Sequence, residues 1–172
     1  YFEENPINSA IEYKEDMVFA LNFGDEIQLA DMNINLDARP YDMQKAYHPH
    51  GNVIYVNACG MQNMDHSVML MEGGSCVLRN GKCLYQAPYF QEDYALVDLA
   101  SQKEDKEKPR SLLAALTMGI QQFDAQVFAG KLPWIVGMSG GLDSSVTAAL
   151  LVYALGKQRV YGYNLATRHN RD

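Results

Sequence analysis

The stretch Gly137-Met138-Ser139-Gly140-Gly141-Leu142-Asp143-Ser144-Ser145 decides how the second half of this chain folds. The apolar run Trp134-Ile135-Val136 comes before it and predicts a buried strand. Residues 144–155 come after it and predict a helix. The apolar face of that helix is expected to comprise Val146, Ala149, Leu150 and Tyr153.

A glycine and two cations predict where this helix ends. Gly156 can adopt the left-handed conformation of a helix cap, and Lys157 and Arg159 complement the carbonyl end of the helix. The run Val160-Tyr161-Gly162-Tyr163 predicts a second strand. Strand, glycine loop, helix and strand make one βαβ unit, so we expect parallel strands and a right-handed crossover.

The glycine loop predicts an anion site. Successive amides from Ser139 to Asp143 can point into one concavity at the positive end of the helix, and such a concavity binds phosphate or pyrophosphate. Ser139, Ser144 and Ser145 add hydroxyl donors. Asp143 would repel an anion unless a divalent cation bridges the two, as Mg²⁺ does between carboxylates and phosphates. The alternative is that Asp143 only complements the helix dipole.

The loop differs from two common phosphate-binding patterns and resembles a third. No lysine follows Gly141, as a Walker A loop requires, and the Gly-x-Gly-x-x-Gly dinucleotide pattern is absent. The loop closely resembles S-G-G-x-D-S, the pyrophosphate loop of the ATP pyrophosphatase family. Members of that family adenylate a carbonyl oxygen, release pyrophosphate, and let ammonia or sulfide displace AMP.

This resemblance implies a set of ligands for ATP and Mg²⁺. Asp143 would ligate Mg²⁺. The residues that would hold the phosphates of ATP are Gly137, Met138, Ser139, Gly140, Gly141, Leu142, Asp143 and Ser144. The loop does not by itself choose the substrate, because NAD, GMP and asparagine synthetases and tRNA-thiolating enzymes all carry versions of it.

Length and composition narrow the class of protein. The chain has 172 residues, enough for one ordinary domain or two small or partial ones, and 48% are hydrophobic, as in a globular protein. We expect no membrane partner, because no apolar run could span a bilayer and no signal segment opens the sequence. A net charge of −7 argues against nucleic-acid binding. Three cysteines without a C-x-x-C pair fit reduced thiols in the cytoplasm.

The first hundred residues predict a unit rich in strands. Asn80-Gly81 is a strong hairpin signal, and Cys59-Gly60 is expected to be a loop after a strand. Cys59 is better interpreted as a buried structural cysteine than as a nucleophile, because no nearby base would activate it. Strands are predicted at residues 17–23, 31–36, 53–57, 76–79, 82–85 and 94–99.

Residues 101–110 mark the expected domain boundary. They include seven charged residues and a proline but no apolar residue, which predicts a solvated linker. Ser111 can cap the next helix, which is predicted to run to Ala129. Its expected apolar face comprises Leu113, Leu116, Ile120, Phe123 and Val127.

A second resemblance covers the part of the chain before the linker. Residues 33–41, residues 53–57 and the segment from Met71 to Lys82 look like the last third of a nitrilase-type amidase domain. In glutamine-dependent NAD synthetases such a domain stands directly before the pyrophosphate-loop domain. Residues 119–123 and 164–170 also resemble the lead-in helix of that family and the segment after its second strand.

The chain departs from the amidase pattern in three places. No Cys-Glu-Asp-x-Trp segment is present, so the Glu-Lys-Cys catalytic triad of the amidase is not seen in this chain. Arg39 stands where the family usually has serine, while Lys45 matches a family lysine and is a candidate for binding the carboxylate of glutamine. The stretch from Lys45 to Val53 is shorter than in the family. We therefore expect a fragment, or a sequence joined across missing segments.

Together the resemblances imply an α/β protein in which the end of a nitrilase-like α/β sandwich joins the start of a parallel-sheet, Rossmann-like ATP pyrophosphatase domain. Residues 1–100 would be the C-terminal part of the glutamine amidase, residues 101–110 a charged linker, and residues 111–172 the N-terminal part of the synthetase. The implied enzyme is a cytoplasmic homo-oligomer that amidates deamido-NAD to NAD with ATP, Mg²⁺ and glutamine-derived ammonia, releasing AMP and pyrophosphate. The alternatives are another amidotransferase, such as a GMP or asparagine synthetase, or a non-catalytic ATP-binding module.

Overall fold

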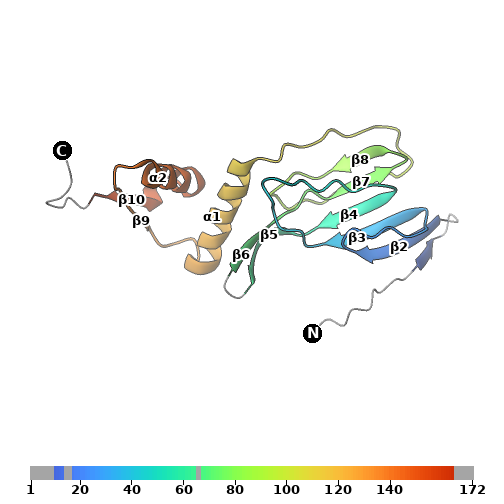
Figure 1. The fold of residues 1–172 in the computed structure, drawn as a ribbon, viewed down its shortest axis with the longest axis horizontal. Helices are drawn as coiled ribbons and strands as arrows, with labels where there is room; N and C mark the ends of the chain where they lie inside the picture. The colour runs from blue at the N-terminus through green and yellow to red at the C-terminus, as the bar shows by residue number, and fades with distance from the viewer. Residues whose placement is uncertain (1–9, 14–16, 65–66, 165–172) are drawn as a thin grey trace. The chain divides into compact units, whose positions relative to one another are not determined.

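A computed structural model describes residues 10–13, 17–64 and 67–164, and it divides the chain into two compact units (Figure 1). The first unit is Tyr1–Leu112 and the second is Leu113–Asp172. Most of the segment at 164–170 that resembles the synthetase family lies outside the described residues. None of the helices in the described ranges is long and apolar enough to cross a membrane.

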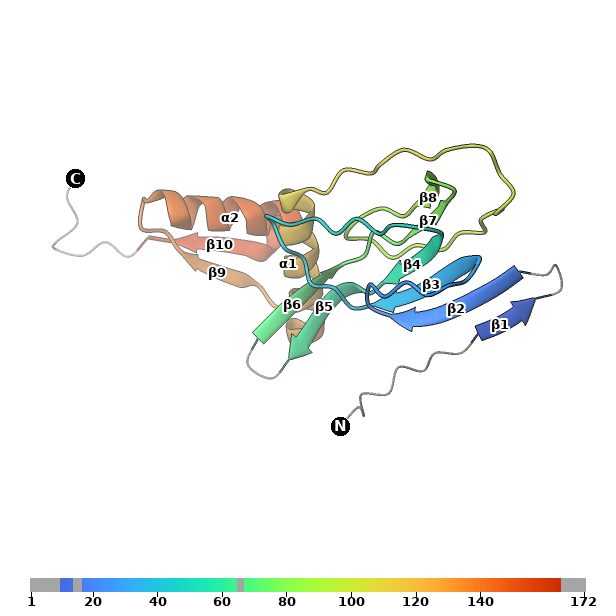
Figure 2. The same ribbon diagram turned by 45° about the vertical axis from the view of Figure 1, so that its right-hand side comes forward.

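The first unit is built on a mixed six-stranded sheet, whose central strands lie side by side in Figures 1 and 2. Neighbours β2 and β3, and β3 and β4, pair in parallel, whereas all other neighbours pair antiparallel. In sheet order the strands are β1 (Ala10–Tyr13), β2 (Met17–Phe23), β3 (Met32–Asp37), β4 (Val53–Asn57), β7 (Cys76–Arg79) and β8 (Lys82–Gln86).

Most of the predicted strands are confirmed. The strands at 17–23, 53–57 and 76–79 have the predicted bounds. Asn80 and Gly81 form the hairpin turn between β7 and β8, with φ of +52° and +73°. Positive φ at both central residues is what the tight turn between right-handed twisted strands requires.

Two predictions in this unit were wrong. Cys59 does not begin a loop, because β5 (Cys59–Met64) pairs antiparallel with β6 (Ser67–Glu72) in a separate hairpin. Residues 94–99 form neither helix nor strand, and the side chains of Tyr94 and Leu96 are 87% and 90% exposed. An alternating pattern makes a strand only where a sheet edge offers hydrogen-bond partners, and residues 94–99 pair with none.

The core of the first unit lies on one face of the sheet. Val53 and Tyr55 of β4 are almost fully buried and pack beside Cys76 of β7. The partly buried side chains of Tyr47 and Leu78 cover them. Removal of this apolar surface from water holds the residues after β3 against the sheet.

A buried network of side-chain amides joins β2 to β3. The Nδ2 of Asn22 donates to Oδ1 of Asn33 at 2.9 Å and to Oδ1 of Asn35 at 3.1 Å. Nε2 of Gln28 donates to Oδ1 of Asn22 at 2.6 Å. Asn35 in turn donates to the carbonyl oxygens of Gly24 and Glu26, so the network fixes the connection between the two strands. Each of the three asparagines is at most 2% exposed.

The charged segment 101–110 is not simply solvated, in contrast to its prediction. Asp105 adds to the edge strand β8, since its N–H donates to the carbonyl of Cys83 at 2.8 Å and its carboxylate accepts from the N–H of Gln86 at 3.0 Å. The carboxylate also accepts from the N–H of Lys106 at 2.8 Å, and the amides of Gln86 and Lys106 hold the pKa of Asp105 below its ordinary value. At the end of the segment the side chain of Arg110 is only 15% exposed.

The second unit contains the predicted βαβ arrangement (Figure 2). Strands β9 and β10 are parallel, with Trp134 opposite Val160, and α2 contacts both. Gly156 ends α2, as predicted, and its N–H donates to the carbonyl of Val152. Its φ of +87° is positive, but its ψ of 149° lies outside the left-handed helical region that was predicted. The elements are α1 (Leu112–Phe128), β9 (Trp134–Gly137), α2 (Leu142–Leu155), the 3₁₀ turn η1 (Lys157–Arg159) and β10 (Val160–Tyr163).

The predicted apolar face of α2 was wrong, and that of α1 was only partly right, since Ile120 and Phe123 are half-buried while Leu113, Leu116 and Val127 are exposed. Leu151 is the buried residue of α2, whereas Tyr153 of the expected face is 66% exposed. In α1 the buried residues include Ala115 and Met118 instead of Leu113. After its first turn α2 is apolar nearly all round, so several faces fit the same spacing. The strand β9 is also less buried than predicted, since Ile135 is 69% exposed. In the described part of the chain, the sheet that contains β9 has only two strands.

Candidate functional site

The glycine loop connects the carboxyl end of β9 to the first turn of α2. Gly137 ends the strand and Leu142 begins the helix, so the predicted motif lies on the turn between them. The N–H of Met138 donates to the carbonyl of Tyr163 at 2.8 Å, which extends the parallel ladder by one bond and fixes the start of the loop. Ligands of open parallel α/β sheets bind at this end of the strands.

The loop is open to solvent where a ligand would approach. Gly140 has φ of +81°, which favours glycine, and Gly141 is the extended N-cap residue of α2. A Cβ built on Gly137 or Gly140 would meet no atom within 4 Å. The first amides of a helix have no acceptor in a preceding turn. They are therefore available to an anion, at the end where the helix dipole is positive.

The serine hydroxyls gather around Gly141. The Oγ atoms of Ser139 and Ser144 are 3.1 Å apart, and the N–H of Gly141 donates to Oγ of Ser139 at 3.3 Å. Ser144 and Ser145 both donate to the carbonyl of Gly141, at 3.1 and 2.9 Å. The structure thus brings the hydroxyls of Ser139 and Ser144 together at the N-terminus of α2, and both Ser144 and Ser145 bind the carbonyl of its N-cap residue Gly141.

Asp143 is exposed in the first turn of α2, one residue after the helix begins. No group of three histidine, cysteine or acidic side chains is positioned to hold a metal ion anywhere in the described part of the chain. A single carboxylate beside phosphate oxygens still suits Mg²⁺, which keeps several of its waters when it binds. The geometry therefore fits Asp143 as one protein ligand of a phosphate-bound cation.

A buried aspartate that sequence reasoning missed holds the elements beneath the loop. Asp124 of α1 accepts a hydrogen bond from Nε1 of Trp134 at 2.8 Å and two from Arg159, at 2.5 Å from Nη1 and 2.8 Å from Nη2. The Arg159 guanidinium and the Trp134 N–H lower the pKa of Asp124. These bonds join α1 to the first residue of β9 and to the last residue of η1, directly before β10, so they fix the starts of the two strands. The sequence signal for this role was that Asp124 is the one charged residue in α1.

Aromatic rings pack around the same junction. The rings of Phe123 and Phe128 lie 6.0 and 5.4 Å from the ring of Trp134, between centroids. The Phe128 and Trp134 rings meet edge to face, which is a favourable arrangement of their charge distributions. The end of α1 is therefore packed against the start of β9.

Lys45 lies in the first unit, in the segment after β3. It is exposed and lines an open cavity of about 400 Å³. The rim of that cavity carries both signs of charge, from Arg39, Lys45, Asp25 and Asp42. Asp25 follows the carboxyl end of β2, and the other three follow the carboxyl end of β3, which is parallel to β2.

Arg39 has several partners at this cavity. Its guanidinium lies 3.0 Å from the carboxylate of Asp37 and 3.7 Å from that of Asp25. It also lies 4.0 Å from the ring centroid of Tyr47, a cation–π contact. Tyr55 donates its hydroxyl to Asp37 at 2.9 Å, and burial followed by the Asp37 charge raises the pKa of Tyr55. These contacts hold the segment that contains Lys45 close to the sheet.

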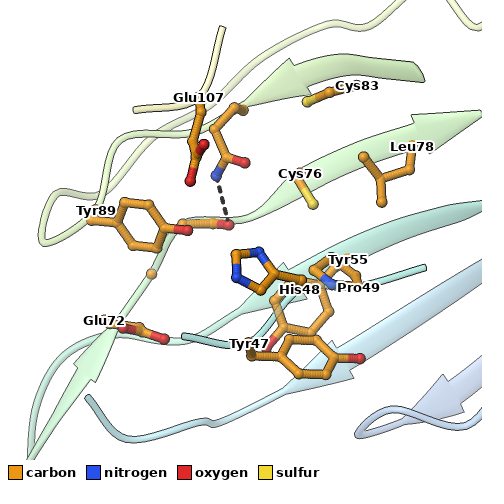
Figure 3. Close-up of a pocket in the computed structure, with 13 residues that line it drawn as sticks. Tyr47, His48, Pro49, Tyr55, Glu72, Cys76, Leu78, Cys83, Tyr89 and Glu107 are labelled. Carbon is orange, nitrogen blue, oxygen red and sulfur yellow. Dashed lines mark hydrogen bonds between the residues drawn. The ribbon is translucent and has the colours of Figure 1, made fainter. Parts of the chain in front are cut away.

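The cysteines of this unit are not activated. Cys76 and Cys83 line a cavity of about 210 Å³. Glu72 and Tyr89 are among the other lining residues (Figure 3). Burial raises the pKa of Cys76 to about 12 and also raises the pKa of Cys83. Burial likewise raises the pKa of Cys59. A nucleophilic cysteine requires the opposite shift, so the structure favours structural thiols.

Comparisons with known proteins support both resemblances. The sequence model of the NAD synthase family matches residues 100–172. The glutamine-dependent NAD(+) synthetase of a Synechocystis species is 32% identical over 167 residues, which cover 84% of this chain and 29% of that protein. The NH(3)-dependent NAD(+) synthetase of Pyrobaculum aerophilum is 50% identical over 58 residues, 34% of this chain and 20% of that protein.

A solved structure shares the fold. The glutamine-dependent NAD+ synthetase from Acinetobacter baumannii, solved in complex with ADP, aligns with a TM-score of 0.72 and 24% identity over 99% of this chain and 38% of that one. The chain thus spans less than a third of the length of the Synechocystis relative. It is a mixed α/β protein similar to the glutamine-dependent NAD synthetases, and it aligns with a part of the length of each.

Proposed function

We propose that residues 137–144 bind the phosphates of ATP in the ATP-dependent amidation of deamido-NAD to NAD. The observation that carries this proposal is the open, glycine-containing N-terminus of α2 at the carboxyl end of a parallel strand. It lies within the residues that match the NAD synthase family. The relative from Acinetobacter baumannii was solved with ADP, which supports a nucleotide as the ligand.

The chain's own contribution to the reaction is the stabilisation of negative charge. The amides at the start of α2 and the Ser139 and Ser144 hydroxyls would contact the oxygens of the departing pyrophosphate. Asp143 would hold Mg²⁺, which neutralises charge on those oxygens. The hydrogen bond from Met138 to Tyr163 fixes the start of the loop before ATP arrives, which reduces the reorganisation required at the reaction step.

We also propose that the cavity at Lys45 receives the α-amino acid end of glutamine. Lys45 is an exposed cation on a rim that also carries Asp25 and Asp42. A zwitterionic amino acid presents a carboxylate and an ammonium group, so a rim with both signs of charge complements it. The amidase triad itself is not seen in this sequence.

The ATP proposal is tested by calorimetric titration of the chain with Mg-ATP. Ser139→Ala removes one hydroxyl near the phosphates, and a hydrogen bond to a charged group contributes about 1.5–3 kcal/mol, so the Kd should rise roughly 10- to 150-fold. Asp143→Asn should weaken binding of Mg-ATP more than binding of ATP without Mg²⁺. Thr147→Ala, an exposed position one turn further along α2, is the matched control and should bind as the parent does. Equal affinity in all variants would refute the phosphate site.

The reaction is tested with the complete gene product. Pyrophosphate release that requires ATP, Mg²⁺ and deamido-NAD, with ammonia as nitrogen source, is the expected result. Release with xanthosine monophosphate or aspartate instead would favour a GMP or asparagine synthetase. Binding of ATP without release on any of these substrates would favour a non-catalytic ATP-binding module.

A further inference from the structure

Arg110 stands at the end of the charged segment, two residues before α1 begins at Leu112. Its Nε donates to Oε2 of Glu72 at 2.5 Å. The side chains of Arg110 and Glu72 are only 15% and 5% exposed, so water screens this ion pair weakly. The two residues are 38 positions apart in the sequence, and the pair fixes the end of the segment against β6.

The second arm of the same guanidinium reaches the segment that contains Lys45. Nη2 of Arg110 donates to the carbonyl of Asp42, and it lies 3.5 Å from the carbonyl of Lys45. The guanidinium also lies 4.5 Å from the ring centroid of Tyr41. One planar side chain therefore binds a buried carboxylate with one edge and the backbone of residues 41–45 with the other.

Further contacts hold the backbone around residues 41–45. The N–H of Tyr41 donates to the carbonyl of Leu70 at 2.7 Å, and the Tyr41 ring packs edge to face on Phe90. After Tyr41 the Asp42 carboxylate accepts from the N–H groups of Gln44 and Lys45, at 2.8 and 3.3 Å. These bonds are internal to the segment. Two residues after Lys45, the Tyr47 ring packs on Tyr55 of the core with 5.1 Å between ring centroids. Between these aromatic contacts, Arg110 joins the carbonyls of Asp42 and Lys45 to Glu72 of β6.

We propose that Arg110 is a positioning residue for glutamine, a role that rests on the proposed function of Lys45. By holding the carbonyls of Asp42 and Lys45, Arg110 sets the direction in which the Lys45 backbone presents its ammonium group to the cavity. A planar guanidinium can bind the Glu72 carboxylate and the Asp42 carbonyl at the same time, whereas a lysine ammonium cannot span a carboxylate and a carbonyl in one plane.

The test compares Arg110→Lys with Arg79→Lys. The lysine at 110 keeps a cation beside Glu72, so the variant is expected to fold, but it loses the second edge of the guanidinium. Arg79 is a matched control, because its Nη1 also donates to a backbone carbonyl, that of Leu99, at 2.8 Å, away from the Lys45 cavity. Hydrogen exchange of the chain measures the positioning directly. The amides of residues 42–46 should exchange about tenfold faster in Arg110→Lys than in the parent, which corresponds to a loss of about 1.4 kcal/mol, and should not change in Arg79→Lys.

The kinetic arm uses the complete gene product with either glutamine or ammonia as nitrogen source. Arg110→Lys should raise the KM for glutamine about tenfold and leave the ammonia-dependent reaction unchanged, as expected for a lost contact that supports binding. Unchanged hydrogen exchange and an unchanged KM for glutamine would refute the positioning role. A loss of the ammonia-dependent reaction of equal size would refute it as well. Absence of any ammonia-dependent NAD formation in the unaltered protein would instead refute the proposed function.

Discussion

Substitution of Gly140 by alanine should weaken ATP binding without disrupting the fold. Gly140 has φ of +81°, and an added Cβ meets no atom within 4 Å, so the only cost is the backbone conformation. For a residue with a Cβ, the left-handed region costs about 1–2 kcal/mol. The exposed loop of the variant can relax to a negative φ when no ligand is bound. Binding must then restore the positive φ, which should raise the Kd for Mg-ATP roughly 5- to 30-fold.

Gly81→Ala is a control that places a Cβ on another residue with positive φ, far from the glycine loop in the sequence. Gly81 has φ of +73° and also leaves open space for a Cβ, but it lies in the hairpin turn between β7 and β8. Both variants should lose at most about 1–2 kcal/mol of unfolding free energy in urea titrations. Calorimetry with Mg-ATP should distinguish them, because only Gly140→Ala alters the loop. A Kd within twofold of the parent for Gly140→Ala, or an equal weakening by Gly81→Ala, would contradict the reasoning.

Three further outcomes are expected in the first unit. Gly74→Ala should lower the unfolding free energy by about 3 kcal/mol or more, because φ is +70° and the new Cβ would overlap the Tyr89 ring. Urea titration measures this loss, with Gly81→Ala as the control for the cost of a positive φ alone. Burial raises the pKa of Glu72 above its ordinary value of 4.5 despite the Arg110 pair, so the folded state binds the proton more tightly and stability falls as pH rises through this window. The stability of Glu72→Gln relative to the parent should therefore rise as the pH increases from the ordinary pKa of 4.5 through the raised pKa of Glu72. Parallel melts measure this, and a difference that does not change with pH would contradict it. Cys76, with a pKa raised to about 12, should react with iodoacetamide about a thousandfold more slowly in the folded chain than in urea, as peptide mass spectrometry can show; equal rates would contradict its burial.

The elements that the sequence predicted correctly carry their signals locally. The glycine loop holds its glycines, serines and aspartate within nine residues, so its position between β9 and α2 followed from adjacent patterns. Asn80-Gly81 specified the hairpin in the same way, because positive φ is a property of the two residues themselves. Such features need no knowledge of distant partners.

The features that the sequence did not predict depend on partners far away in the chain. Arg159 was interpreted only as a helix-end cation, whereas it binds Asp124, 35 residues earlier. The β5–β6 hairpin forms from a methionine-rich stretch with little strand propensity, because six backbone pairs stabilise it. Residue spacing cannot identify which apolar face of a uniformly apolar helix is buried, and α2 is an example. Tertiary contacts decide these choices.

The amide network between β2 and β3 has a consequence for strand alignment. In the native pairing Asn22 lies opposite Asn35 and Ala20 lies opposite Asn33, so the amides share one side of the sheet. A slip of one residue would turn one partner's amides to the other side and leave buried donors unpaired, and each unpaired group costs about 1–3 kcal/mol. Uncharged amides also neither titrate nor respond to salt. Acidity and ionic strength that weaken neighbouring ion pairs should therefore leave the mutual alignment of these two strands intact.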